Sequence, residues 1–129
     1  MRVLHVGKFF PPFSGGIENF MCDLLGACAA CQVDQMAIVH HDKPGVATLR
    51  EQVRTCGNSP VEIVRVRSFG RLLYAPVAPG FGQAMEAAAR AFRPDLVHVH
   101  MPNLSAFWLL RSRALAHVPW VVHWHADVA

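Results

Sequence analysis

Residues 8–20 have the sequence KFFPPFSGGIENF, and this stretch decides the fold of the chain. The apolar segment before it, residues 2–7, is typical of a short buried strand. After Gly15 and Gly16, apolar residues recur at helical spacing and predict a helix over 17–30. Two glycines let a ligand approach the backbone, and the N–H groups of a helix start favour an anionic group such as phosphate. The stretch therefore predicts a ligand-binding turn between a first strand and a first helix.

The rest of the chain alternates strand-like and helix-like segments. Further strands are predicted over residues 34–39, 61–66, 95–98 and 120–124. Further helices are predicted over residues 83–92 and 104–116, with a short helix near 47–55. Short apolar strands separated by helices predict an α/β fold, a Rossmann-like doubly wound parallel sheet covered on both faces. Because the last strand needs a covering helix, we expect this single domain, residues 1–129, to be incomplete at its C-terminal side.

Composition narrows the function classes. The chain has 129 residues, 53% of them hydrophobic and 16% charged, which suits one well-buried domain. A formal net charge of +3 is too small to indicate a nucleic-acid partner. The four cysteines do not form a convincing disulfide framework, which favours reduced thiols and a cytoplasmic location. No apolar run is long enough to span a membrane.

Three segments carry the candidate chemistry, and each lies at the carboxyl end of a predicted strand. They are the Gly-Gly turn, the sequence PDLVHVH at residues 94–100, and the sequence VVHWHAD at residues 121–127. In an open parallel sheet the carboxyl ends of the strands meet at one edge, where ligands bind. We therefore expect the three segments to line one crevice.

The three motifs resemble the N-terminal domain of glycosyltransferase family 4, retaining enzymes of GT-B architecture. Gly-Gly-x-Glu, Pro-Asp-x-x-His-x-His and His-x-His-Ala-Asp occur in the family's order, and the resemblance covers essentially the whole chain. It implies transfer of a sugar from a nucleotide-sugar donor to a saccharide or lipid-linked acceptor, with retention and without a metal or other cofactor. It also implies a C-terminal nucleotide-sugar domain that is missing here, so we expect this chain alone to be inactive.

The resemblance assigns roles by position. His125 matches the active-site histidine close to the transferred sugar, and we expect it to be catalytic. The other matching positions are expected to contact donor or acceptor, or to support the site, and they are Gly15, Gly16, Glu18, His100 and Asp127. For Glu18, a favourable interaction with the helix dipole is an equally good explanation. His98 and His123 are expected to be structural.

A zinc hydrolase is an alternative interpretation of the same histidines. His123, His125 and Asp127 match the start of a His-x-His-x-Asp-His metal motif, and the histidines of residues 94–100 could add ligands. Val128 stands where that motif needs a histidine. A weaker metal or redox signal comes from Cys28 and Cys31, which have no second cysteine pair.

Other functions remain open on the sequence alone. A non-catalytic module could bind the acceptor while a partner chain supplies the donor site. A dinucleotide-binding oxidoreductase is disfavoured because Gly-x-Gly-x-x-Gly is absent after the first strand. Arg65, Arg67 and Arg71 could form a basic patch for peripheral contact with the cytoplasmic membrane face, or an ordinary solvated face.

Overall fold

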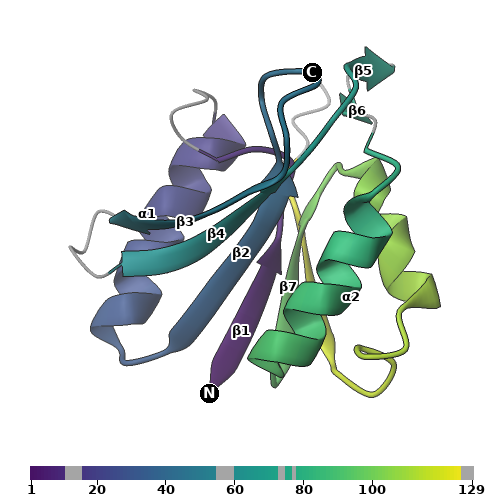
Figure 1. The fold of residues 1–129 in the computed structure, drawn as a ribbon. Coiled ribbons are helices and arrows are strands. Elements are labelled where there is room, and N and C mark those ends of the chain that lie inside the picture. Colours follow the sequence, from purple (N-terminus) through teal and green to yellow (C-terminus); the bar gives the residue numbers. More distant parts are fainter. Residues whose placement is uncertain (11–15, 55–59, 73–74, 77, 126–129) are drawn as a thin grey trace.

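A computed structural model describes residues 1–10, 16–54, 60–72, 75–76 and 78–125 of the chain. Strands and helices alternate along most of it, as Figure 1 shows. The strands are β1 (Arg2–Val6), β2 (Asp34–His40), β3 (Leu49–Arg54), β4 (Pro60–Val66), β5 (Arg71–Leu72), β6 (Ala75–Pro76), β7 (Leu96–Met101) and β8 (Trp120–Trp124). The helices are α1 (Gly16–Ala30), α2 (Phe81–Phe92) and the 3₁₀ helix η1 (Leu104–Arg111).

The main sheet has six strands in the order β3-β4-β2-β1-β7-β8. All neighbouring pairs in it are parallel except β3 and β4, which pair antiparallel. Helix α1 covers one face of the sheet, and α2 and η1 cover the other (Figure 1). The predicted α/β fold, a Rossmann-like sheet covered on both faces, is confirmed.

Side chains of the central strands alternate between two apolar clusters. Met36 and Ile38 of β2 belong to the cluster beneath α2 and η1, whereas Ala37 and Val39 belong to the cluster beneath α1. This two-residue period is expected for strands buried on both faces. In α1 the cluster is completed by Met21 and Leu25, both fully buried. The core therefore lies on both sides of β2 and β4.

Residues 49–54 form β3 and not the short helix predicted near 47–55, so that prediction is wrong. The charges of this segment explain the outcome. Arg50 forms an ion pair with Glu62 of β4, and Glu51 Oε1 lies 2.7 Å from Arg65 Nε of the same strand. Diagonal pairs across two strands stabilise a sheet and need an extended backbone. Tertiary pairing therefore overrides a local preference for helix.

The helix predicted over 104–116 forms only in its first half, as the 3₁₀ helix η1. It begins after Asn103, whose side chain accepts a hydrogen bond from Ser105 N. It ends at Ser112, whose hydroxyl donates to a carboxylate oxygen of Glu86 in α2 at 2.5 Å. The backbone N–H of Ala114 donates to the other Glu86 oxygen. These bonds to α2 hold residues 112–114 away from helical geometry.

Strand β7 extends to Met101, three residues beyond the predicted end of its strand. His100 therefore lies within the sheet and not just beyond it. Within the described parts of the chain, no helix combines the length and apolarity needed to cross a bilayer.

Candidate functional site

The predicted site residues that the structure describes lie at the start of α1 and toward the carboxyl ends of β7 and β8. Gly16 is the first residue of α1, and Glu18 is buried in its first turn. His100 lies in β7, and His125 directly follows β8. Gly15 and Asp127 lie outside the described residues, so their predicted roles stay predictions.

Five imidazoles share the face of the sheet that α1 only partly covers, and we name this group the histidine layer: His5, His98, His100, His123 and His125. Parallel register explains the grouping, because His5 pairs with His98 across β1 and β7, and His100 pairs with His123 across β7 and β8. Ring centroids are 4.2 Å apart in the pair His98–His100 and 4.0 Å apart in the pair His123–His125. The sheet thus places two His-x-His pairs side by side.

Phe20 of α1 lies against the outer part of the histidine layer. Its ring meets His123 at 4.8 Å and His125 at 5.0 Å between centroids, both edge to face. The backbone N–H of His125 also donates to Met101 O at 2.9 Å. Helix α1 and the end of β7 together fix the ring of His125 at the sheet edge.

A chain of hydrogen bonds runs from α1 to His125, and we name it the histidine relay: Leu25 O, Gln35, His5, His100 and His125. Gln35 Nε2 donates to Leu25 O at 2.8 Å. Gln35 Oε1 lies 3.0 Å from His5 Nε2. His5 Nδ1 lies 3.4 Å from His100 Nε2, and His100 Nδ1 lies 3.0 Å from His125 Nε2.

The fixed end of the relay determines the tautomers. A backbone carbonyl only accepts, so the Gln35 amide must turn its NH₂ to Leu25 and its oxygen to His5. His5 then carries its proton on Nε2, and its Nδ1 accepts from Nε2–H of His100. By the same step, Nδ1 of His100 accepts from Nε2–H of His125. We therefore assign neutral His125 the Nε2–H tautomer, with Nδ1 as a hydrogen-bond acceptor.

Burial keeps the relay uncharged. It lowers the pKa of His5 to about 4, despite the hydrogen bond to Gln35. Burial, with the nearby imidazoles of His98 and His5, lowers the pKa of His100 to about 2. Burial and His123 also lower the pKa of His125. At neutral pH these rings are uncharged, as the assigned tautomers require.

His40 ties two further segments to the same edge. Its Nδ1 lies 2.6 Å from Lys8 O and its Nε2 lies 2.6 Å from Ser105 Oγ. Since the carbonyl only accepts, Nδ1 donates to Lys8, and the Ser105 hydroxyl donates to Nε2. The ring stacks on Phe81, and burial lowers the pKa of His40 to about 4. This histidine holds the segment after β1 against η1.

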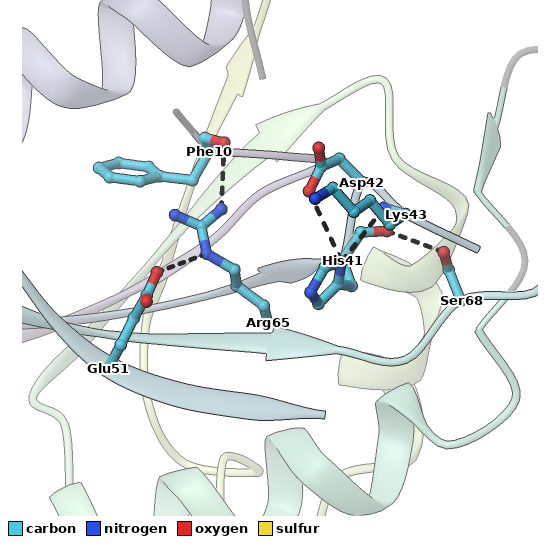
Figure 2. A network of polar contacts seen from close by, with 7 residues as sticks. All are labelled: Phe10, His41, Asp42, Lys43, Glu51, Arg65 and Ser68. Atoms are coloured by element: carbon cyan, nitrogen blue, oxygen red, sulfur yellow. Dashed lines mark hydrogen bonds and ion pairs between the residues drawn. The ribbon is translucent and has the colours of Figure 1, made fainter. Parts of the chain in front are cut away.

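Arg65 supports the same segment from the other side (Figure 2). Its Nη1 donates to Phe10 O at 3.1 Å, and its Nε donates to Glu51 Oε1 at 2.7 Å. Arg65 is only 4% exposed. The suggested basic surface patch of Arg65, Arg67 and Arg71 is therefore wrong for Arg65, which is buried as a structural anchor.

Figure 2 also shows a second anchor, at the ends of β2 and β4. Ser68 donates its hydroxyl to His41 O at 2.8 Å. The Lys43 N–H donates to His41 Nδ1 at 3.1 Å, and a carboxylate oxygen of Asp42 lies 3.5 Å from the same nitrogen. These bonds order the loop after β2, which borders the edge that carries the site.

The sequence motifs did not single out His5 or Gln35, yet both belong to the relay. One signal was present, because a histidine within the buried apolar strand 2–7 needs a polar partner. The identity of that partner depends on strand register, which the sequence alone does not reveal.

Cys28 and Cys31, the weaker metal or redox candidate, have free thiols at the end of α1. Burial, together with the neighbouring Cys31, raises the pKa of Cys28. A raised thiol pKa disfavours a reactive thiolate.

Comparison with known proteins gives a family and a fold. The sequence matches the glycosyl transferase 4-like domain over residues 15–129. No curated protein matches the chain at a significant level. Among solved structures, sucrose-phosphate synthase from Thermosynechococcus elongatus superposes with a TM-score of 0.66 at 18% sequence identity. The match covers 97% of this chain and 33% of that chain, so this chain spans about a third of that protein. At this identity the superposition supports the fold, and the match over residues 15–129 shows that the chain belongs to the glycosyl transferase 4-like domain family.

Proposed function

We propose that this domain forms the acceptor-side half of the active site of a retaining glycosyltransferase. The reaction transfers a sugar from a nucleotide-sugar to a saccharide or lipid-linked acceptor. The observation that carries the proposal is the placement of His125 at the carboxyl edge of the sheet, held by the histidine relay with Nδ1 as acceptor. A ring fixed in this way can accept a hydrogen bond from a sugar hydroxyl without reorganising.

The other site residues take supporting roles in this proposal. His100 is 1% exposed and acts through His125, whose tautomer it sets. The N–H group of Gly16 at the start of α1 stabilises phosphate charge, as helix starts do, and Gly15, the preceding residue in the sequence, contributes its own N–H group. Buried Glu18 shapes that start, and Asp127 supports the crevice beyond His125. Holding donor and acceptor in line in this way can lower the activation free energy by roughly 7–11 kcal/mol.

The proposal also needs a second, nucleotide-binding domain. In the GT-B architecture that the sequence resembles, that second domain binds the nucleotide of the donor. Activity then depends on that domain, and transfer requires no metal. The free thiols of Cys28 and Cys31 support a reducing, cytoplasmic compartment. With a lipid-linked acceptor, the protein would bind peripherally at the cytoplasmic face of the membrane.

The test is His125→Ala in the intact gene product, assayed with a panel of nucleotide-sugars and acceptors. We expect turnover to fall on the order of a hundredfold, the usual cost of losing one preorganised hydrogen-bonding group in an active site. The matched control is His117→Ala, because His117 is an exposed histidine before the amino end of β8. Proton NMR of the product reports whether the anomeric configuration is retained.

The outcomes separate the alternatives. Turnover of His125→Ala within a few-fold of the wild type would contradict the catalytic role. Binding of sugar or sugar phosphate without transfer by the intact gene product would instead favour a non-catalytic acceptor-binding module. Hydrolysis without transfer to an acceptor, lost on metal removal, would favour the zinc hydrolase.

A further inference from the structure

The inner part of the histidine layer has the spacing of a metal site. His5, His98 and His100 each place one ring nitrogen so that the three atoms lie within 4.8 Å of one another. His5 Nδ1 and His100 Nε2 are 3.4 Å apart. Two nitrogens that bind one tetrahedral zinc ion at ~2.0–2.1 Å lie about 3.3 Å from each other. The pair is therefore already at ligand spacing.

His98 supplies an independent observation. Its Nε2 is buried and has no hydrogen-bond partner among the described residues. An unsatisfied buried polar atom costs about 1–3 kcal/mol, so it calls for a function or a ligand. The ring stacks on His100 at 4.2 Å and lies 5.3 Å from His5 between centroids. The unsatisfied atom thus belongs to the ring beside the pair at ligand spacing.

The surroundings of His5 match those of a metal-bound histidine. Its Nε2–H donates to Gln35 Oε1, whose amide is fixed by Leu25 O. Histidines that bind metals usually donate the other ring N–H to such an oxygen, which fixes tautomer and orientation. This leaves the Nδ1 lone pair directed at the cluster. Burial also lowers the pKa of His5, His98 and His100, so each ring is neutral at neutral pH and has one unprotonated nitrogen to offer a metal.

We propose that His5 Nδ1, His98 Nε2 and His100 Nε2 bind one divalent late transition-metal ion, with zinc as the reference ion. Three neutral imidazoles suit zinc, nickel, copper or cobalt and do not suit magnesium or calcium. Three protein ligands leave one tetrahedral position for water or an added ligand. The site differs from the zinc motif seen in the sequence, which started from His123, His125 and Asp127 and took His98 and His100 only as added ligands, because this site centres on His5 and uses neither His125 nor Asp127.

Metal binding would also reverse the direction of the hydrogen bond between His100 and His125. A metal on His100 Nε2 needs that lone pair, so the single proton of neutral His100 moves to Nδ1. Nδ1–H then donates to His125 Nε2, and the single proton of His125 moves to its own Nδ1. Each ring keeps one proton, so none is gained or lost. His125 changes from acceptor to donor at the sheet edge. The effect on transfer rests on the proposed function, whereas metal binding does not.

Binding is tested by adding Co²⁺ to the metal-free protein and following its visible absorbance, with Zn²⁺ competition by calorimetry. We expect one equivalent to bind with the spectrum of nitrogen and oxygen ligands. His98→Ala should weaken binding at least tenfold, since one of three ligands is lost, and His117→Ala should leave it unchanged. Circular dichroism checks the fold of each variant, and His98→Cys, which restores a ligand, should recover binding.

Three results would overturn the proposal. The first is no stoichiometric uptake by the wild type, and the second is equal affinity in the wild type and folded His98→Ala. The third is a thiolate-to-cobalt band in the wild type, which would assign the metal to a cysteine. An unchanged His125 tautomer in zinc-loaded protein, read by nitrogen NMR, would overturn the coupling to the relay. None of these measurements uses transfer, so failure of the proposed function does not affect them.

Discussion

The face of the sheet beneath α1 has two halves with opposite chemistry. Over β2 and β4 it is apolar, with Ala37, Val39 and Ile63 packed against Leu25 and its neighbours. Over β1, β7 and β8 it carries the histidine layer. The other face of β7 is ordinary core, because Val97 and Val99 pack beneath α2 and η1. The same strand therefore serves stability on one face and a polar site on the other.

The two halves contribute to the free energy of unfolding through different interactions. The apolar half gains free energy from burial and needs only volume and shape. The histidine half is buried but gains stability only while its hydrogen bonds are made and its rings stay neutral. We expect pH, truncation and loss of a hydrogen bond to act very differently on the two halves.

Acid should produce the largest effect, on the histidine half and through His40 on the opposite face, and it should leave the apolar half unaffected. Burial lowers the pKa of His5 in the folded protein to about 4, against about 6.5 for an ordinary histidine, so between these values the unfolded chain binds more protons. Stability from His5 is therefore complete above about pH 6.5, falls as pH falls, and stops falling below about pH 4, a loss of roughly 3 kcal/mol. His100, whose pKa is lowered further, adds to the loss.

Urea unfolding of the wild type at several pH values measures this slope. His5→Asn should reduce it, because the unfolded chain then has one histidine fewer to protonate. Equal slopes in the wild type and His5→Asn would mean that the ring is not buried neutral.

Leu25→Ala should give the next largest effect, on the apolar half. Leu25 is fully buried between α1 and the sheet, and such truncations cost about 2–5 kcal/mol in the free energy of unfolding. The backbone carbonyl that fixes Gln35 remains. The loss should hardly change with pH, and a loss below about 1 kcal/mol would contradict the assigned packing.

Gln35→Leu should have a smaller effect on stability and a specific effect on the relay. It removes the acceptor of His5 Nε2–H, which costs about 1–3 kcal/mol when a buried donor is left unpaired. It also removes the group that fixes which ring nitrogen of each histidine carries the proton. His125 should therefore show a mixture of tautomers in nitrogen NMR. Gln83→Leu, at an exposed position of α2, is the control. A pure Nε2–H signal from His125 in Gln35→Leu would show that another group sets the order.

His98→Ala should have the smallest effect on stability. Truncation removes the unsatisfied Nε2 atom, which costs stability, and also the ring that stacks on His100, which adds stability. These two contributions oppose each other, so the free energy of unfolding should change by less than about 1 kcal/mol. Thermal melting in metal-free buffer measures this, and a loss as large as that of Leu25→Ala would mean that both halves depend on packing alone.

Much of the fold could be predicted from the sequence, and the reasons are local. Strand β2 and helices α1 and α2 have strong apolar periodicity, and their predicted and observed bounds agree to within two residues at each end. Strand β3 could not be predicted, because its extended form depends on pairing with Glu62 and Arg65 of another strand. The second half of the predicted 104–116 helix was lost to bonds with Glu86, which are also long-range.

The site was predicted in outline and missed in its interior. The motifs pointed to His100 and His125, because both come just after a predicted strand in the sequence. They did not reveal the relay, which joins residues 30, 95 and 25 positions apart in sequence. Parallel register brings these residues together, and no local pattern records register.

The most direct test of this account is the tautomeric state of the histidine rings in the metal-free wild-type protein at neutral pH. Long-range nitrogen–proton NMR reports which ring nitrogen carries the proton. We predict the Nε2–H form for His5, His100 and His125 together, because one carbonyl, Leu25 O, sets the direction of all three bonds. A proton on Nδ1 of His125, or a protonated ring at His100, would contradict the relay and the role that it gives to His125.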